Sequence, residues 1–162
     1  MNTIKMVVCL LCRYRIKLSL LPLTSTKGST GSFNINYQEE SRPDGTFVNL
    51  VKINTNKVYV HWFKCDNIPT TFLHEIGHVA NILRYVGKRR KPKVLDDVLY
   101  SERRASIYAL RVGKLFGIDP KQKADVVNYW YGTYVAHFCK GDSMRLADES
   151  YKGVKTFGVK YD

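Results

Sequence analysis

One short stretch of the chain has the residue types and spacing of a metal-dependent hydrolytic site. Residues 74–78 are His-Glu-Ile-Gly-His, an H-E-x-x-H pentad. On an α-helix, residues four positions apart lie one turn above each other, with Cβ atoms about 5–6 Å apart. Two imidazoles at that spacing can both bind one Zn²⁺, and a glutamate beside them can accept a proton from a bound water. The pentad predicts His74 and His78 as zinc ligands and Glu75 as the general base.

The residues around the pentad predict the helix that this spacing requires. Apolar residues at positions 72, 76, 79, 83 and 86 fall in one narrow stripe at 100° per residue. His74 and His78 fall with Asn81 on nearly the opposite side, and Gly87 is a stop signal. The alternative is a helix with two incidental surface histidines. The metal site is favoured because the pentad arises by chance in only about half a percent of chains of this length.

A catalytic zinc usually has three protein ligands and a water. The pattern H-E-x-x-H-x-x-G-x-x-H is absent, because Asn81 and Arg84 occupy the positions of its glycine and third histidine. The candidates for the third ligand are Asp96, Asp97, Glu102 and His137. Asp96 and Asp97 stand where the N-terminus of a following helix explains them electrostatically.

Glu102 has no such explanation, because it belongs to the packing face of the helix predicted over 101–116. Most residues of that face are small, namely Ala105, Ser106, Ala109 and Gly113. Small residues let another helix approach closely, and a glutamate among them is costly unless it is paired or binds a metal. An antiparallel pair of helices would direct Glu102 toward His74 and His78, so Glu102 is favoured as the third ligand.

These residues resemble those of the gluzincin metallopeptidases, in which a glutamate from a following helix joins the H-E-x-x-H histidines. More narrowly, the pentad with Glu102-Arg103-Arg104-Ala105 and the pair Tyr108-Ala109 resembles the ImmA/IrrE family. The resemblance covers about Pro69 to Phe116. It implies a zincin-like cytoplasmic metallopeptidase, often encoded by a phage or mobile element and acting in the host cytoplasm, that cleaves a regulatory protein.

The family pattern leaves parts of the chain without an assigned role. No helix-turn-helix pattern is present, and the N-terminal strands and the C-terminal tail have no counterpart in the family. Gluzincins often use a downstream His or Tyr to stabilise the oxyanion, but no motif assigns that role here. His137 and Tyr134 are the candidates, and each also fits an ordinary core or surface position.

Hydrophobic periodicity predicts an α+β fold, with a small, mostly antiparallel sheet before a helical half. Alternating residues predict strands over 13–20 and 33–37, and a hairpin of 47–53 with 57–63 around Asn54-Thr55-Asn56. An edge strand just before the metal helix could bind an extended peptide by strand addition. Further helices are expected over 119–139 and after 142, and residues 1–162 are expected to form one domain.

The composition restricts the classes of partner. Lys and Arg number 26 against 14 Asp and Glu, a net charge of +12, which favours an acidic protein or peptide partner or a nucleic acid. Ten of these basic residues, with three acids, lie between Arg84 and Lys114, a local charge of +7. No apolar run approaches the roughly 18 residues of a membrane-spanning helix. The four cysteines, including Cys9 and Cys12, are expected to be reduced structural thiols.

Three functions remain open at this point. The first is a zinc-dependent peptide-bond hydrolase. The second is a zinc-containing structural or binding protein without turnover, such as a phage particle component. The third is a basic nucleic-acid-binding regulator, which rests on charge alone. The intact Glu75 favours the hydrolase, because a purely structural zinc site needs no general base.

Overall fold

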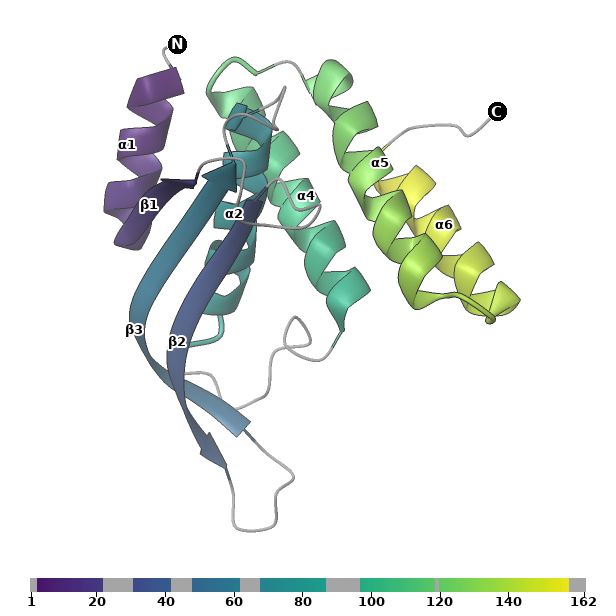
Figure 1. The fold of residues 1–162 in the computed structure, drawn as a ribbon, viewed down its shortest axis with the longest axis horizontal. Helices are drawn as coiled ribbons and strands as arrows, with labels where there is room; N and C mark the ends of the chain where they lie inside the picture. Colours follow the sequence, from purple (N-terminus) through teal and green to yellow (C-terminus); the bar gives the residue numbers. More distant parts are fainter. Residues whose placement is uncertain are drawn as a thin grey trace.

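The computed structural model of the chain describes residues 3–21, 31–41, 48–61, 68–86, 97–118 and 120–157. The molecule is predominantly helical (Figure 1). Its helices in these ranges are α1 (Thr3–Tyr14), α2 (Ile68–Leu83), α4 (Val98–Leu115), α5 (Pro120–Phe138) and α6 (Ser143–Phe157). Its strands are β1 (Ile16–Leu21), β2 (Gly31–Ser41) and β3 (Val48–His61). No helix within these ranges is long and apolar enough to cross a membrane.

The strands form one three-stranded sheet with the order β1-β3-β2. β2 and β3 pair antiparallel as expected, whereas β1 pairs parallel with β3, so one of the two pairings departs from the prediction. β3 is therefore the central strand. The expectation that the strand before the metal helix is an edge strand, open to an added peptide, is wrong because β1 and β2 occupy both of its sides.

Two local predictions in the N-terminal half are also wrong. The hairpin expected around Asn54-Thr55-Asn56 does not form, and β3 runs through these residues as one strand paired with β2. Pairing decides the structure here, because Thr55 pairs with Asn36 of β2, and Asn56 pairs with Ile35 of β2 on one side and Ile16 of β1 on the other. The second is the start of the first strand: the strand predicted over 13–20 begins only at Ile16, because the unpredicted helix α1 continues to Tyr14. Arg15, at φ 52°, separates this helix from β1, and Cys9 and Cys12 lie exposed on α1.

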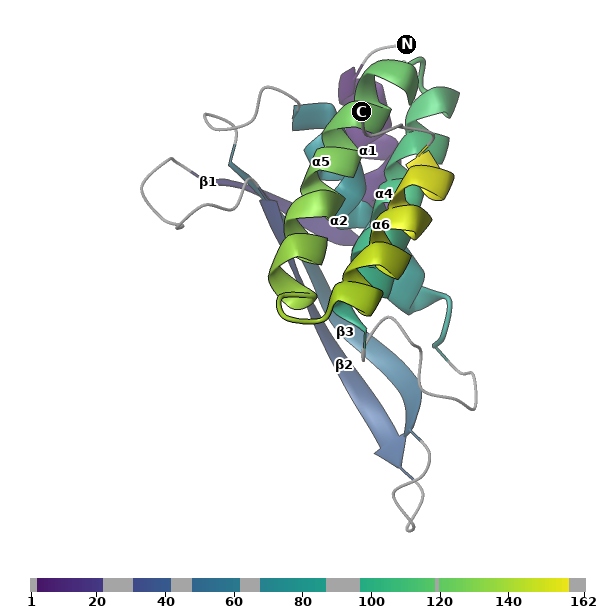
Figure 2. The same cartoon turned by 90° about the vertical axis from the view of Figure 1, so that its right-hand side faces the viewer.

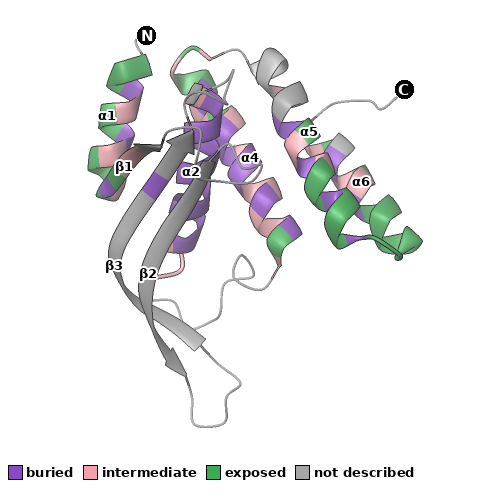
Figure 3. Cartoon of the chain, viewed as in Figure 1, coloured by how far each residue is buried: buried purple, intermediate pink, exposed green. Residues whose placement is uncertain are grey.

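Helix α2 is the central element of the fold. It packs against β2 and β3 on one side and against α4 on the other, and α1 covers the neighbouring part of β1 and α2 (Figures 1 and 2). Every residue from Thr71 to Ile82 is buried, which Figure 3 shows as a continuous purple helix. The predicted apolar stripe supplies Phe72, Ile76 and Val79 to the core, together with Val58 of β3.

A second core joins α4, α5 and α6 on the other side of the molecule. Leu99, Val127, Tyr131, Val135 and Phe157 are buried there in one cluster. Helix α5 agrees closely with the helix predicted over 119–139. The chain leaves α5 through Gly141, whose φ of +85° is the left-handed conformation that glycine adopts without strain.

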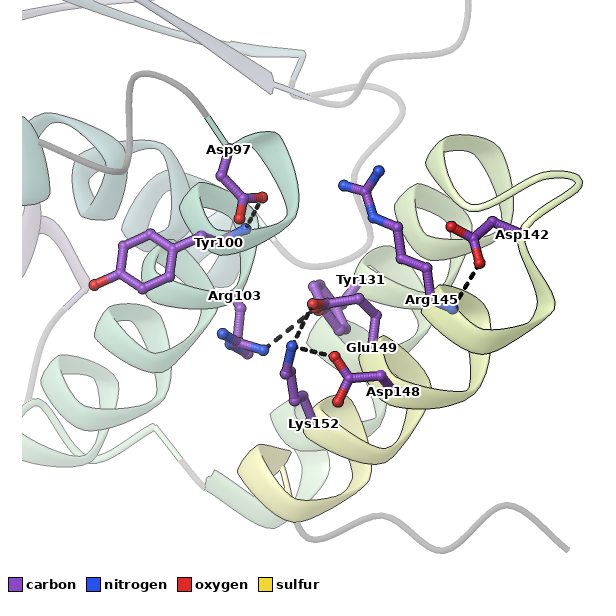
Figure 4. Close-up of polar contacts among 9 residues, drawn as sticks. All are labelled: Asp97, Tyr100, Arg103, Tyr131, Asp142, Arg145, Asp148, Glu149 and Lys152. Atoms are coloured by element: carbon purple, nitrogen blue, oxygen red, sulfur yellow. Dashed lines mark hydrogen bonds and ion pairs between the residues drawn. The ribbon is translucent and has the colours of Figure 1, made fainter.

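Buried and half-buried charges connect these three helices around Glu149 of α6 (Figure 4). The Tyr131 hydroxyl donates to Glu149 at 2.5 Å, and Arg103 of α4 donates to the same oxygen at 3.4 Å. Lys152 donates to the other oxygen of Glu149 at 2.7 Å and also to Asp148. Because Arg103 adjoins Glu102, the cluster anchors the helix that carries the predicted third metal ligand.

Candidate metal centre

The three predicted ligands come together at the interface of α2 and α4. Nε2 of His74 lies 3.0 Å from Oε2 of Glu102, and Nε2 of His78 lies 3.4 Å from Oε1. The two Nε2 atoms are 3.2 Å apart. All the candidate ligand atoms lie within 4.8 Å of one another, and all three residues are buried. Buried His74, His78 and Glu102 therefore lie close enough to bind one metal ion.

The separations of these atoms fit a tetrahedral ion. Two atoms each bound at roughly 2.05 Å to a tetrahedral zinc lie about 3.3 Å apart. The two Nε2 atoms, 3.2 Å apart, and the pair of His74 Nε2 and Glu102 Oε2, 3.0 Å apart, are close to that value, and Nε2 of His78 lies 3.4 Å from the other carboxylate oxygen, Oε1. The donor set is two imidazole nitrogens and one carboxylate oxygen, as in three-ligand catalytic sites that leave one position for water.

The other ring nitrogens of both histidines contact serines of α4. Nδ1 of His74 lies 3.2 Å from Oγ of Ser106, and Nδ1 of His78 lies 3.0 Å from Oγ of Ser101. These contacts orient the imidazoles so that Nε2 of each faces Glu102. Such partners of metal-binding histidines fix the ring orientation and the tautomer. Ser106 was expected only as a small residue of the packing face and Ser101 had no expected role, although both are helical neighbours of Glu102.

A close helix crossing brings Glu102 to the histidines. A Cβ atom on Gly77 would lie 2.8 Å from the Cα atom of Ala105, 2.8 Å from its carbonyl oxygen and 3.1 Å from Cβ of Tyr108. Only glycine therefore fits at position 77 without a backbone shift. The predicted small-residue face of α4 is the face against α2: Ala105, Ser106, Ala109 and Gly113 are all buried. The helices are antiparallel, since Leu73 lies near Gly113 and His78 near Ser101.

The pKa shifts of four residues at the site, His74, Glu75, His78 and Glu102, have distinct causes. Burial raises the pKa of Glu75 to about 7, with the charge of Glu102 adding to the shift and that of His74 opposing it. Burial also acts to raise the pKa of Glu102, but hydrogen bonds from both histidines outweigh it and lower the pKa to about 2. Burial lowers the pKa of His78 below its ordinary value. Burial acts in the same direction on His74, but Glu102 and Glu75 together raise its pKa.

Helix α5 brings two aromatic residues to this site. The Trp130 ring lies edge-on to the His74 ring, with centroids 5.7 Å apart. Tyr134 is 37 % exposed, and partial burial together with the charges of Glu102 and Glu75 raises its pKa to about 12, so Tyr134 lies within electrostatic reach of both carboxylates. Trp130 is a site neighbour that the sequence analysis did not single out, because nothing in the sequence specifies how α5 packs on α4.

The remaining candidates have other positions. Asp97 is the N-cap of α4 and accepts a hydrogen bond from the Tyr100 backbone N–H at 3.0 Å, which is the electrostatic role expected for it (Figure 4). Asp96 lies outside the described residues. His137 is exposed near the end of α5, with its ring 4.9 Å from that of Phe138. In the described structure, metal-binding donors converge at His74, His78 and Glu102, without Asp97 or His137.

Comparisons with known proteins add no family assignment to this geometry. The chain matches no protein-family model, no curated protein and no solved structure.

Proposed function

We propose that the chain is a zinc-dependent peptide-bond hydrolase with a zincin-like α+β fold and a site of the gluzincin type. One observation carries the proposal: the ligand atoms of His74, His78 and Glu102 lie within 4.8 Å of one another, next to the buried carboxyl of Glu75. Glu75 follows His74 directly and its charge affects the pKa of that histidine, which supports a position beside the metal. The resemblance to the ImmA/IrrE pattern supports the same assignment.

Zinc is the proposed metal because the donor set suits it. Imidazole nitrogen and carboxylate oxygen are common zinc ligands, and two histidines with one glutamate form a familiar catalytic set. Glu102, with its pKa of about 2, is ionised throughout the physiological range and supplies one negative charge. The serines at the two Nδ1 atoms support binding through Nε2.

The chain's own residues would then divide the chemistry between them. Bound zinc supplies a Lewis acid and lowers the pKa of a water molecule. Glu75, buried next to His74, would accept the proton of the attacking water and pass it to the leaving amine. Tyr134, with its pKa of about 12, stays protonated at neutral pH and is the proposed hydrogen-bond donor to the oxyanion. His137, the other sequence candidate, is also exposed on α5, and Tyr134 is preferred because the charges of Glu75 and Glu102 act on it.

The proposed substrate is a protein or peptide, for instance a regulatory protein of a phage or its host. An acidic substrate would suit the net charge of +12. Part of the basic stretch 84–114 is accounted for otherwise, since Arg103 is paired with Glu149. A nucleic-acid partner has no support beyond charge.

A metal-binding structural protein without turnover is the second candidate. It is favoured by burial, because Glu75 is only 7 % exposed and His78 only 3 % exposed. It is disfavoured by the number of ligands, since structural zinc sites usually have four protein ligands and the described residues supply three. Zinc content alone does not separate these two functions, so the test must measure turnover.

The test compares the unaltered protein with Glu75→Gln on a broad peptide library, using a substrate cut in a chelator-sensitive way. Glu75→Gln keeps the side-chain shape but cannot accept a proton, so zinc binding should persist while hydrolysis falls by about 10²–10⁴-fold. Asp148→Asn, an exposed change on α6, is the control and should leave hydrolysis unchanged. Equal rates for Glu75→Gln and the unaltered protein would exclude Glu75 as the base. No chelator-sensitive cleavage by the unaltered protein would favour the structural role.

A further inference from the structure

A second site lies between α1, α2 and α4, and none of the four metal-site residues lines it. It is a cavity of about 350 Å³. This volume is at the lower end of the range of roughly 300–1,000 Å³ for small-molecule sites. Its apolar wall comes mainly from Leu10, Ile107, Val112, Leu115 and Phe116.

Four arginines surround this cavity, and no acidic residue of the described ranges lines it. They are Arg13 of α1, Arg84 beyond the end of α2, and Arg104 and Arg111 of α4. Within the described part of the chain, none of the four forms an ion pair with an acidic side chain. Arg13, Arg84 and Arg111 are exposed, so their charges lie toward solvent while the apolar wall extends inward.

The inner wall holds polar groups that a ligand could contact. Asn81 is 3 % exposed and lines the cavity, and its buried amide nitrogen has no hydrogen-bond partner among the described atoms. An unpartnered buried donor costs free energy, so its presence next to a cavity indicates a missing acceptor. Tyr14 and Tyr108 also line the cavity, and the Tyr108 hydroxyl donates a hydrogen bond to the Tyr14 hydroxyl at 3.0 Å.

We propose that this cavity binds an organic phosphate of nucleotide size. Arginine forks match phosphate oxygens in pairs, and four guanidinium groups that form no ion pair with a described acidic residue match a doubly or more highly charged group better than a single carboxylate. The apolar wall and the tyrosine rings then contact the organic body of the ligand. The Asn81 amide donates to an acceptor on that body, such as a ring nitrogen or carbonyl oxygen.

The proposal is independent of hydrolysis at the metal centre, and calorimetric titration of the full chain tests it. The probes are inorganic pyrophosphate and the four ribonucleoside 5′-diphosphates. At least one nucleotide should bind saturably and more tightly than pyrophosphate, because only the nucleotide reaches the apolar wall and Asn81. Glu102→Gln, which alters the metal centre, should leave this affinity unchanged.

Three variants test the residues involved. Arg84→Gln with Arg111→Gln removes two exposed cavity charges and should weaken nucleotide binding on the order of tenfold or more. Lys140→Gln with Arg145→Gln removes two exposed charges elsewhere and should have little effect, since neither residue lines the cavity. Asn81→Leu should weaken nucleotide binding by a similar factor without lowering the unfolding midpoint, because it removes an unpartnered donor.

Several results would overturn the proposal. One is no saturable binding of any probe, and another is equal weakening by the two double variants, which would indicate a general charge effect. Pyrophosphate binding as tightly as every nucleotide, with no effect of Asn81→Leu, would exclude recognition of an organic body. Because Arg84 and Arg111 are exposed, their variant should fold even if Asn81→Leu does not.

Discussion

Gly77 of α2 and Ala105 of α4 are in backbone contact, so close that a Cβ atom on Gly77 would lie 2.8 Å from the Ala105 Cα atom. This contact sets the distance between the two helices that carry the metal centre. Glu102 lies one turn before Ala105, and it reaches both His74 and His78 only because the helices approach this closely. The glycine of the pentad therefore determines the geometry of the site although it has no chemical role.

Gly77→Ala should destabilise the protein and weaken its metal binding. Overpacking typically costs about 1–3 kcal/mol, and the obstacle here is backbone, so the loss should exceed the roughly 1 kcal/mol that alanine gains in helix propensity. Gly113→Ala is the matched control on the same helix interface. A Cβ atom on Gly113 would be 3.4 Å from side chains of Ile118 and Leu73, which is ordinary contact. The unfolding free energy of the Gly113→Ala variant should therefore stay the same or rise. Urea denaturation measures both, and equal tolerance of the two changes would contradict the close crossing.

Ser101→Ala and Ser106→Ala should each weaken metal binding without unfolding the protein. The hydroxyls lie 3.0 and 3.2 Å from Nδ1 of His78 and His74, and loss of such a partner typically costs about 10–100-fold in metal affinity. Ser150→Ala on α6 is the control, and competition with a zinc-binding dye measures the affinities. Unchanged affinity in both variants would show that the serines do not orient the histidines.

The site was more predictable from the sequence than the sheet was. The pentad requires only a helix, and the helix is indicated by the buried residues Phe72, Ile76 and Val79. The position of Glu102 followed from a second helical periodicity and one assumption, that the two helices pack antiparallel. Both steps use the spacing of residues within a single helix, which can be read directly from the sequence.

The errors arose where tertiary contacts decide the structure. The alternating residues 13–20 predicted a strand, whereas the helix α1 before it depends on burial of Met6 and Leu10, which are four residues apart. Continuity of β3 depends on its long pairing with β2, which no local signal at Thr55 reveals. The packing of Trp130 on His74 depends on how α5 lies against α4, and the sequence does not specify that arrangement.

Glu75→Gln should stabilise the metal-free protein at high pH. The carboxyl ionises near 4.5 when unfolded and near 7 when folded, so its contribution to stability is fully present below about pH 4.5 and is lost as the pH rises through 7. The variant cannot ionise. Its advantage in unfolding free energy should therefore grow by on the order of 3 kcal/mol between pH 4 and pH 8. Urea denaturation with chelator present measures it, and a difference independent of pH would show that Glu75 is not buried in this way.

Glu149→Gln should destabilise the packing of α4, α5 and α6. The carboxylate accepts hydrogen bonds from Tyr131, Arg103 and Lys152, so its loss should cost about 1–3 kcal/mol. Hydrogen bonds from Lys152 and Tyr131 outweigh burial and lower the pKa of Glu149, so the deficit should be largest above the pH where this carboxyl ionises in the unfolded chain and shrink as the pH falls. Asp148→Asn, at an exposed partner of Lys152, should change stability by less than about 0.5 kcal/mol. Equal effects of the two changes in thermal unfolding would contradict the role given to Glu149.

The most direct test of the metal centre is the zinc content of the purified protein, measured by elemental analysis for the unaltered chain, Glu102→Gln and Asp97→Asn. The unaltered protein should contain about one zinc per chain, as a single three-ligand site implies. Asp97→Asn should keep that zinc, because asparagine also caps a helix and Asp97 is not a ligand. Glu102→Gln should lose most of it. An unaltered protein that contains no zinc and takes none up, or a Glu102→Gln variant that retains it fully, would contradict the account.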